Sequence, residues 1–69
     1  MAKQKARREP MRKLKAMRVL KGYTLQSLAE KVGINYNTIN QYELGIHAPR
    51  ADNLRLIADA LECDISEII

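Results

Sequence analysis

The three glycines of the chain, Gly22, Gly33 and Gly45, restrict it to short helices. Each follows a stretch in which apolar residues recur at three- and four-residue spacing, which is typical of one buried face of a helix. Glycine readily adopts the left-handed conformation that ends a helix. No useful stretch alternates apolar and polar residues, as a half-buried strand would. The spacing therefore predicts an all-α fold built from short helices.

Five helices are predicted, and they form one compact bundle. They are expected at 10–21, 25–32, 36–44, 51–61 and 65–69. Pro10 suits a first helical turn, and Thr24 and Asn35 are good N-caps for the second and third helices. The apolar stripe of the first helix ends at Leu20, and the inner face of the fourth begins at Ala51. Both residues are therefore expected in the core.

Only one residue, Ile34, separates the stop signal Gly33 from the next N-cap, Asn35. The third helix must therefore begin almost where the second ends. Two short helices joined by a tight turn that contains glycine are typical of a helix-turn-helix.

A chain of 69 residues with the single cysteine Cys63 has no disulfide and no paired His/Cys spacing for zinc. Helix packing alone must hold its core, in which Cys63 is expected as a small residue. A lone thiol and the lack of a secretory signal favour the cytoplasm, and no apolar run is long enough to span a membrane. No catalytic constellation and no glycine-rich phosphate loop is visible. We therefore expect no enzyme activity, cofactor, metal or small-molecule substrate.

The charge is distributed unevenly along the chain. Residues 1–22 carry nine Lys or Arg against one Glu, whereas 23–69 carry three against seven Asp or Glu. This pattern predicts a basic arm at 1–9 that precedes a domain at 10–69. A basic segment on an acidic body indicates a polyanionic partner, with nucleic acid first and an anionic membrane surface second. An arm that only aids solubility is the alternative.

The third predicted helix has an unusual outer face. On a helical wheel Ile39 and Tyr42 point to the core, while Leu44 and four polar residues share the other arc. The four polar residues are Tyr36, Asn37, Asn40 and Gln41. Asn and Gln offer a donor and an acceptor, which match the N6 and N7 edge of adenine in the major groove. Ordinary surface residues are the alternative for the amides, and packing between helices is the alternative for Tyr36.

The sequence resembles a known family, the lambda-repressor-like, Xre-type helix-turn-helix DNA-binding domain. The resemblance runs from Leu14 to Ile69. The residues that carry it are Leu14-x-x-Met17-Arg18, Gly22-Tyr23-Thr24, Leu28-Ala29-x-x-Val32-Gly33-Ile34, Thr38-Ile39-x-x-Tyr42-Glu43-x-Gly45, Pro49 and Leu54-x-x-Ile57-Ala58-x-Ala60-Leu61. It implies a five-helix bundle whose third helix lies in the major groove of double-stranded DNA.

The resemblance also implies roles for individual residues. The base-reading positions are those of the four polar residues of the third helix, and Arg18 and Glu43 occupy the positions of a structural ion pair. The residues expected at the DNA backbone are Thr24, Gln26, Asn35, Thr38 and Arg50. Three residues depart from the pattern. Leu25 and Leu44 stand where polar residues are usual, and Glu62 stands where glycine is common.

These features predict a sequence-specific transcriptional regulator, a bacterial or phage repressor, that binds DNA as a homodimer. Its two half-sites would lie about 34 Å apart. The predicted dimer surface is an exposed end formed by Ile65, Ile68 and Ile69. Two alternatives stay open at this point. One is a protein-interaction module, such as an antitoxin or co-activator, and the other is a general nucleic-acid or RNA binder that acts through the arm.

Overall fold

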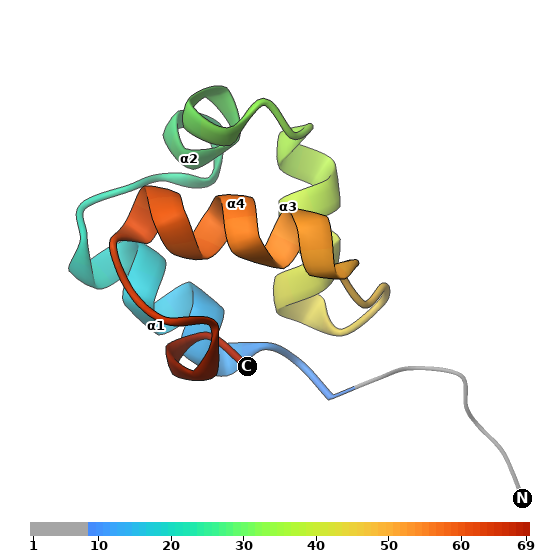
Figure 1. The fold of residues 1–69 in the computed structure, drawn as a ribbon. Helices are drawn as coiled ribbons and strands as arrows, with labels where there is room; N and C mark the ends of the chain where they lie inside the picture. The colour runs from blue at the N-terminus through green and yellow to red at the C-terminus, as the bar shows by residue number, and fades with distance from the viewer. Residues whose placement is uncertain (1–8) are drawn as a thin grey trace, which may run out of the picture.

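The computed structural model describes residues 9–69, and this part of the chain contains helices but no strand. The elements are α1 (Arg12–Leu20), α2 (Leu25–Val32), α3 (Tyr36–Leu44), α4 (Ala51–Leu61) and the 3-10 helix η1 (Ile65–Glu67). Figure 1 shows α4 crossing the middle of the molecule, with α2 and the start of α3 on one side and α1 and η1 on the other. The all-α expectation is confirmed. The predicted arm, except for Glu9, lies outside the described residues.

The prediction of five α-helices is wrong, because the described residues form four and the last element is one 3-10 turn. In it the Glu67 amide donates to the Asp64 carbonyl at 2.9 Å and the Ile68 amide donates to the Ile65 carbonyl at 3.0 Å. Bonds that reach back three residues are common in such short pieces. A carboxylate also closes the turn, since the Asp64 amide donates to Oε2 of Glu67 at 2.9 Å.

The helix boundaries otherwise follow the predicted caps closely. Gly33 and Gly45 end α2 and α3 in the left-handed conformation, with φ of 74° and 81°. The exception is the start of α1. Its first hydrogen bond joins the Lys15 amide to the Met11 carbonyl at 3.2 Å, so the helix begins after Met11 and Pro10 lies outside it.

Every element contributes to one apolar core. The fully buried large side chains are Leu14, Leu28, Ile39, Ile57, Leu61 and Ile68. Burying one such side chain contributes about 1.5–3 kcal/mol, so this shared cluster is the main force that holds the four helices together. Since α4 supplies two of the six, it forms the centre against which the other helices pack.

Two residues expected in the core are exposed instead. Leu20 is 74% exposed, and Ala51 is also exposed. Each helical residue advances about 100°, so apolar residues that follow one another at steps of three drift by about 60° a step. Leu20 is two such steps from Leu14, and Ala51 is two such steps from Ile57. Both are therefore turned about 120° away from the buried line.

The predicted dimer surface at the end of the chain is also wrong. Ile68 is fully buried in the core and Ile65 packs partly against it, so only Ile69 is exposed. The segment turns back onto α1, where Nζ of Lys13 donates to the Ser66 carbonyl at 2.9 Å. The apolar character of these isoleucines thus reflects intramolecular packing.

Cys63 packs partly buried against the core, as expected for a small apolar residue. Burial raises the pKa of its thiol. The Glu67 and Asp64 carboxylates also raise this pKa, whereas Lys21 lowers it. A raised pKa keeps the thiol protonated and poorly reactive at neutral pH, which favours a packing role.

Glu62 is the only described residue other than glycine with a positive φ. Its φ of 57° and ψ of 46° are left-handed values, and it caps the end of α4. The family pattern prefers glycine at this position. The backbone of Glu62 therefore adopts the left-handed conformation that glycine would adopt, although the Cβ atom of Glu62 makes this conformation sterically unfavourable. A residue with a Cβ pays about 1–2 kcal/mol for it.

We therefore expect Glu62→Gly to raise the free energy of unfolding by about 1 kcal/mol, because glycine removes the steric penalty. Urea unfolding followed by circular dichroism measures the change. Glu62→Ala is the matched control, since it removes the same charge but keeps the Cβ. Equal gains for the two variants would show that charge, not backbone conformation, is responsible.

Candidate nucleic-acid interface

The segment from α2 to α3 is a compact, internally bonded unit. The amides of Gly33 and Ile34 both donate to the Ala29 carbonyl, at 2.8 Å and 3.2 Å, and close the end of α2. Leu28 and Ile39 then bring the two helices into the same core. Backbone bonds and packing together fix the angle between α2 and α3, which is the helix-turn-helix arrangement that the sequence predicts.

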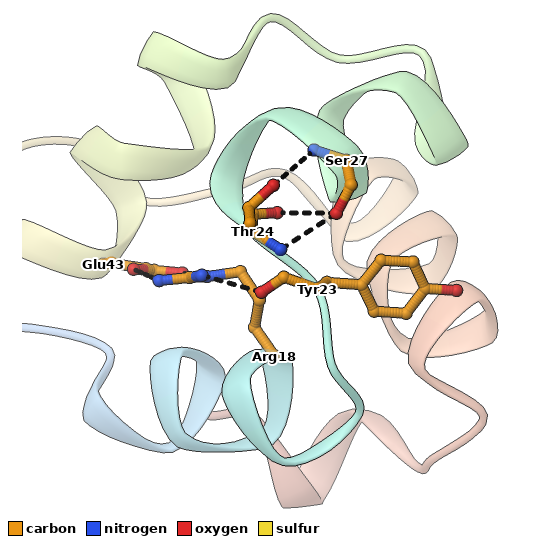
Figure 2. A network of polar contacts seen from close by, with 5 residues as sticks. All are labelled: Arg18, Tyr23, Thr24, Ser27 and Glu43. Carbon is orange, nitrogen blue, oxygen red and sulfur yellow. Dashed lines mark hydrogen bonds and ion pairs between the residues drawn. The ribbon is translucent and has the colours of Figure 1, made fainter.

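Both helices of this unit have side-chain caps. Thr24 and Ser27 bond reciprocally before α2: the Ser27 amide donates to Oγ1 of Thr24 at 3.0 Å, and the Thr24 amide donates to Oγ of Ser27 at 2.9 Å (Figure 2). Before α3, the Asn37 amide donates to Oδ1 of Asn35 at 2.8 Å. Such caps typically stabilise a helix by about 1 kcal/mol each.

The four predicted base-reading residues lie on the accessible side of α3. Tyr36 and Asn37 are exposed, and Asn40 and Gln41 are half-buried, whereas Ile39 and Tyr42 are buried. Among the described residues, the side-chain bonds of α3 are made by Tyr42 and Glu43, not by the three amides. Within residues 9–69 the side-chain donors and acceptors of those amides have no hydrogen-bond partner, so this part of the chain leaves them available to another molecule.

The residues predicted at the DNA backbone fall into two groups. Thr24 and Asn35 use their side-chain oxygens as caps, so each offers only its hydroxyl or amide donor outward. Gln26 and Arg50 are exposed, at the start of α2 and immediately before α4, and Thr38 is half-buried. The side-chain amide of Gln26 donates to Glu30 in a long bond of 3.4 Å. None of these five residues belongs to the apolar core.

Arg18 and Glu43 form the expected ion pair. Nε of Arg18 donates to Oε2 of Glu43 at 2.7 Å, and Nη2 donates to Oε1 at 3.1 Å. Nη1 donates to the Tyr23 carbonyl at 2.9 Å, as Figure 2 shows. Arg18 is 8% exposed and Glu43 is 7% exposed, so little water competes for these bonds. One guanidinium thus joins α1, the loop before α2, and α3.

Sequence reasoning missed two features near this face. Nδ2 of Asn53 donates to the Tyr42 hydroxyl at 2.9 Å and joins α4 to α3; no pattern in the sequence pairs these two residues. Arg12 and Lys15 of α1 line a groove that Asn40 and Leu44 of α3 also line. The excess of basic residues before Gly22 is the sequence signal for these cations, although it does not place them beside α3.

Residues 9–69 contain neither a membrane-spanning helix nor a cluster of metal ligands. None of the helices there has the length and apolar character needed to cross a bilayer. That part of the chain also has no group of three or more His, Cys, Asp or Glu side chains arranged to hold a metal ion.

The sequence profile of the helix-turn-helix family matches residues 14–68. The chain belongs to this family. It is 33% identical over 57 residues, 83% of each chain, to the uncharacterized HTH-type transcriptional regulator YazB of Bacillus subtilis (strain 168). The fold is similar to the crystal structure of the restriction-modification controller protein C.AhdI from Aeromonas hydrophila. That match has a TM-score of 0.79 and 24% identity, and it covers 84% of this chain and 88% of the other.

The family match includes the whole of α2 and α3, so these two helices are the helix-turn-helix of the protein. The resemblance to the Xre type that the sequence suggests is thereby confirmed. This is a helix-turn-helix protein of the DNA-binding class that is associated with the regulation of transcription.

The buried ion pair makes a clear prediction about stability. Glu43→Gln removes the charge that Arg18 needs, and leaving one partner of a buried pair alone costs about 3–5 kcal/mol. We expect the free energy of unfolding in urea to fall by this order. The control replaces both partners, as Arg18→Met with Glu43→Leu, and should recover most of the loss. If Glu43→Gln unfolds at the urea concentration of the wild type, the pair does not hold α3 in place.

Proposed function

We propose that this protein is a sequence-specific transcriptional regulator that reads the major groove of double-stranded DNA with α3. One observation carries the proposal: three amide side chains and a tyrosine share the accessible side of a short helix, and none of the four belongs to the apolar core. An ordinary solvated helix face is rich in Lys and Glu, and this face has neither at the four positions.

Recognition would rely on the geometry of the amides. Asn37 and Gln41 each offer one donor and one acceptor, which suits the N6 and N7 atoms of adenine. Tyr36 is the first residue of α3, and the start of a recognition helix is the part that approaches base edges. Tyr36 is 50% exposed, so its side chain is accessible for apolar contact with a thymine methyl group.

Contacts to phosphates would hold α3 in register on the duplex. Thr24 and Gln26 stand at the start of α2, Asn35 and Thr38 near the start of α3, and Arg50 immediately before α4. Hydroxyl, amide and guanidinium donors all bind phosphate oxygens, and such contacts position the protein without reading sequence. These residues therefore set orientation, whereas the four α3 residues set site preference.

We further propose that the protein is a cytoplasmic repressor that binds as a homodimer. Two copies on a palindromic site would place their α3 helices in successive major grooves, about 34 Å apart on one side of the duplex. A dimer that covers such a site denies it to other proteins, and this is the simplest way for a small DNA-binding domain to act as a repressor. Ile68 takes no part in the dimer surface, since it is buried.

The decisive experiment is selection of bound sequences from a random duplex pool, followed by footprinting on the winning sequence. We expect an enriched palindrome whose half-sites are separated by about one turn of DNA, roughly 10 base pairs. A pool that shows no enrichment, together with tight binding to a protein partner without DNA, would instead identify a protein-interaction module.

The base-reading role predicts a specific pattern of loss. Asn37→Ala or Gln41→Ala should weaken binding to the selected site by about 1–3 kcal/mol and reduce discrimination against base changes at one position of it. Binding of each variant is compared, by titration at fixed salt, on the selected duplex and on a duplex of mixed sequence. An equal loss on both duplexes contradicts base reading.

A further inference from the structure

A groove of about 500 Å³ lies between α1 and α3, next to the proposed base-reading face. Arg12, Lys15 and Val19 line it from α1, and Asn40 and Leu44 line it from α3. Asn40 belongs to both the groove and the polar face of α3. Any molecule that fills the groove therefore touches the edge of the surface proposed to enter the major groove.

The charge available to an occupant of this groove is positive. Arg12 and Lys15 are exposed, and the first turn of α1 has no acidic residue. Glu43 also lines the groove, but Arg18 neutralises it through two hydrogen bonds. Residues three apart on a helix have Cβ atoms about 5–6 Å apart, so both cations can reach one strand of phosphates.

The walls between these cations are apolar and accessible. Val19 is 59% exposed and Leu44 is 46% exposed. A DNA strand alternates anionic phosphates with deoxyribose rings, whose carbon surfaces suit such side chains. A groove lined by both cations and apolar side chains matches that alternation.

Leu44 indicates why cations on α1 would be needed beside α3. Position 44 is one at which the family pattern usually has a polar or basic residue, and leucine cannot bind phosphate there. The α1 cations line the same groove as Leu44, so they can supply the charge that α3 lacks.

We propose that the groove between α1 and α3 is a second binding site for the DNA backbone. Arg12 and Lys15 bind phosphates in it, and Val19 and Leu44 pack against the sugars of the same strand. This inference rests on the proposed function, because the groove is filled only when α3 lies in the major groove.

The test measures how the affinity for the selected duplex depends on salt. Each lost phosphate contact lowers the slope of log K against log salt by about 0.9, so Arg12→Ala with Lys15→Ala should lower it by about 1.8 and leave site preference unchanged. Lys31→Ala with Arg55→Ala is the matched control: it also removes one exposed lysine and one exposed arginine, and its slope should stay near that of the wild type. Thermal unfolding of each variant verifies that it is folded.

Replacing Leu44 sharpens the test. Leu44→Lys in the Arg12→Ala, Lys15→Ala background should restore about one unit of slope, because a cation then returns to the same strand. A double variant whose slope equals that of the wild type or the Lys31, Arg55 control overturns the inference, and so does a Leu44→Lys variant without rescue. In that case the groove is free for a protein partner. Failure of the wild type to bind DNA would instead overturn the proposed function itself.

Discussion

The bidentate pair between Arg18 and Glu43 fixes the position of α3, and the placement of the proposed DNA-binding face depends on it. The apolar core decides that four helices pack together, but apolar contacts alone tolerate small rotations of one helix against another. A buried guanidinium with two fixed carboxylate bonds tolerates much less. Since its third bond goes to the loop before α2, the pair fixes α3 against α1 and α2 together.

The fixed position of α3 explains how a small protein can expose a polar helix face to solvent and still keep that helix in one orientation. The same helix carries Ile39, Tyr42 and Glu43 inward, where each has a partner or a place in the core. The outward polar residues do not belong to the apolar core, so core packing constrains their identity less and they can carry functional groups. Because the buried side of α3 packs in the core and the exposed side carries the polar residues, α3 can present a recognition surface within a stable fold.

Much of this arrangement could be predicted from the sequence, for reasons that are local. Thr24, Asn35 and the glycines act on the residues directly around them, so the helix boundaries follow from short-range chemistry. The polar face of α3 follows from helical periodicity alone. The Arg18–Glu43 pair is different, because its members are 25 positions apart, and only the family pattern suggested it.

The errors about burial have two causes. Apolar residues spaced three apart drift around the helix axis. The sequence pattern therefore predicts Leu20 and Ala51 in the core, although both face outward. Ile68 read as exposed because the sequence does not show that the last turn folds back on α1. The phosphate-binding potential of Arg12 and Lys15 was hidden for a related reason: their charge is visible in the sequence, but their position beside α3 is a property of packing.

The burial of Ile68 also bears on the order in which the molecule is made. This side chain belongs to the same cluster as Leu14, from near the other end of the described chain, and η1 rests on α1. During synthesis α1 leaves the ribosome well before position 68 does. The local turns of α1 to α4 can form as the chain emerges, but their common core is completed only after Ile68 has been added.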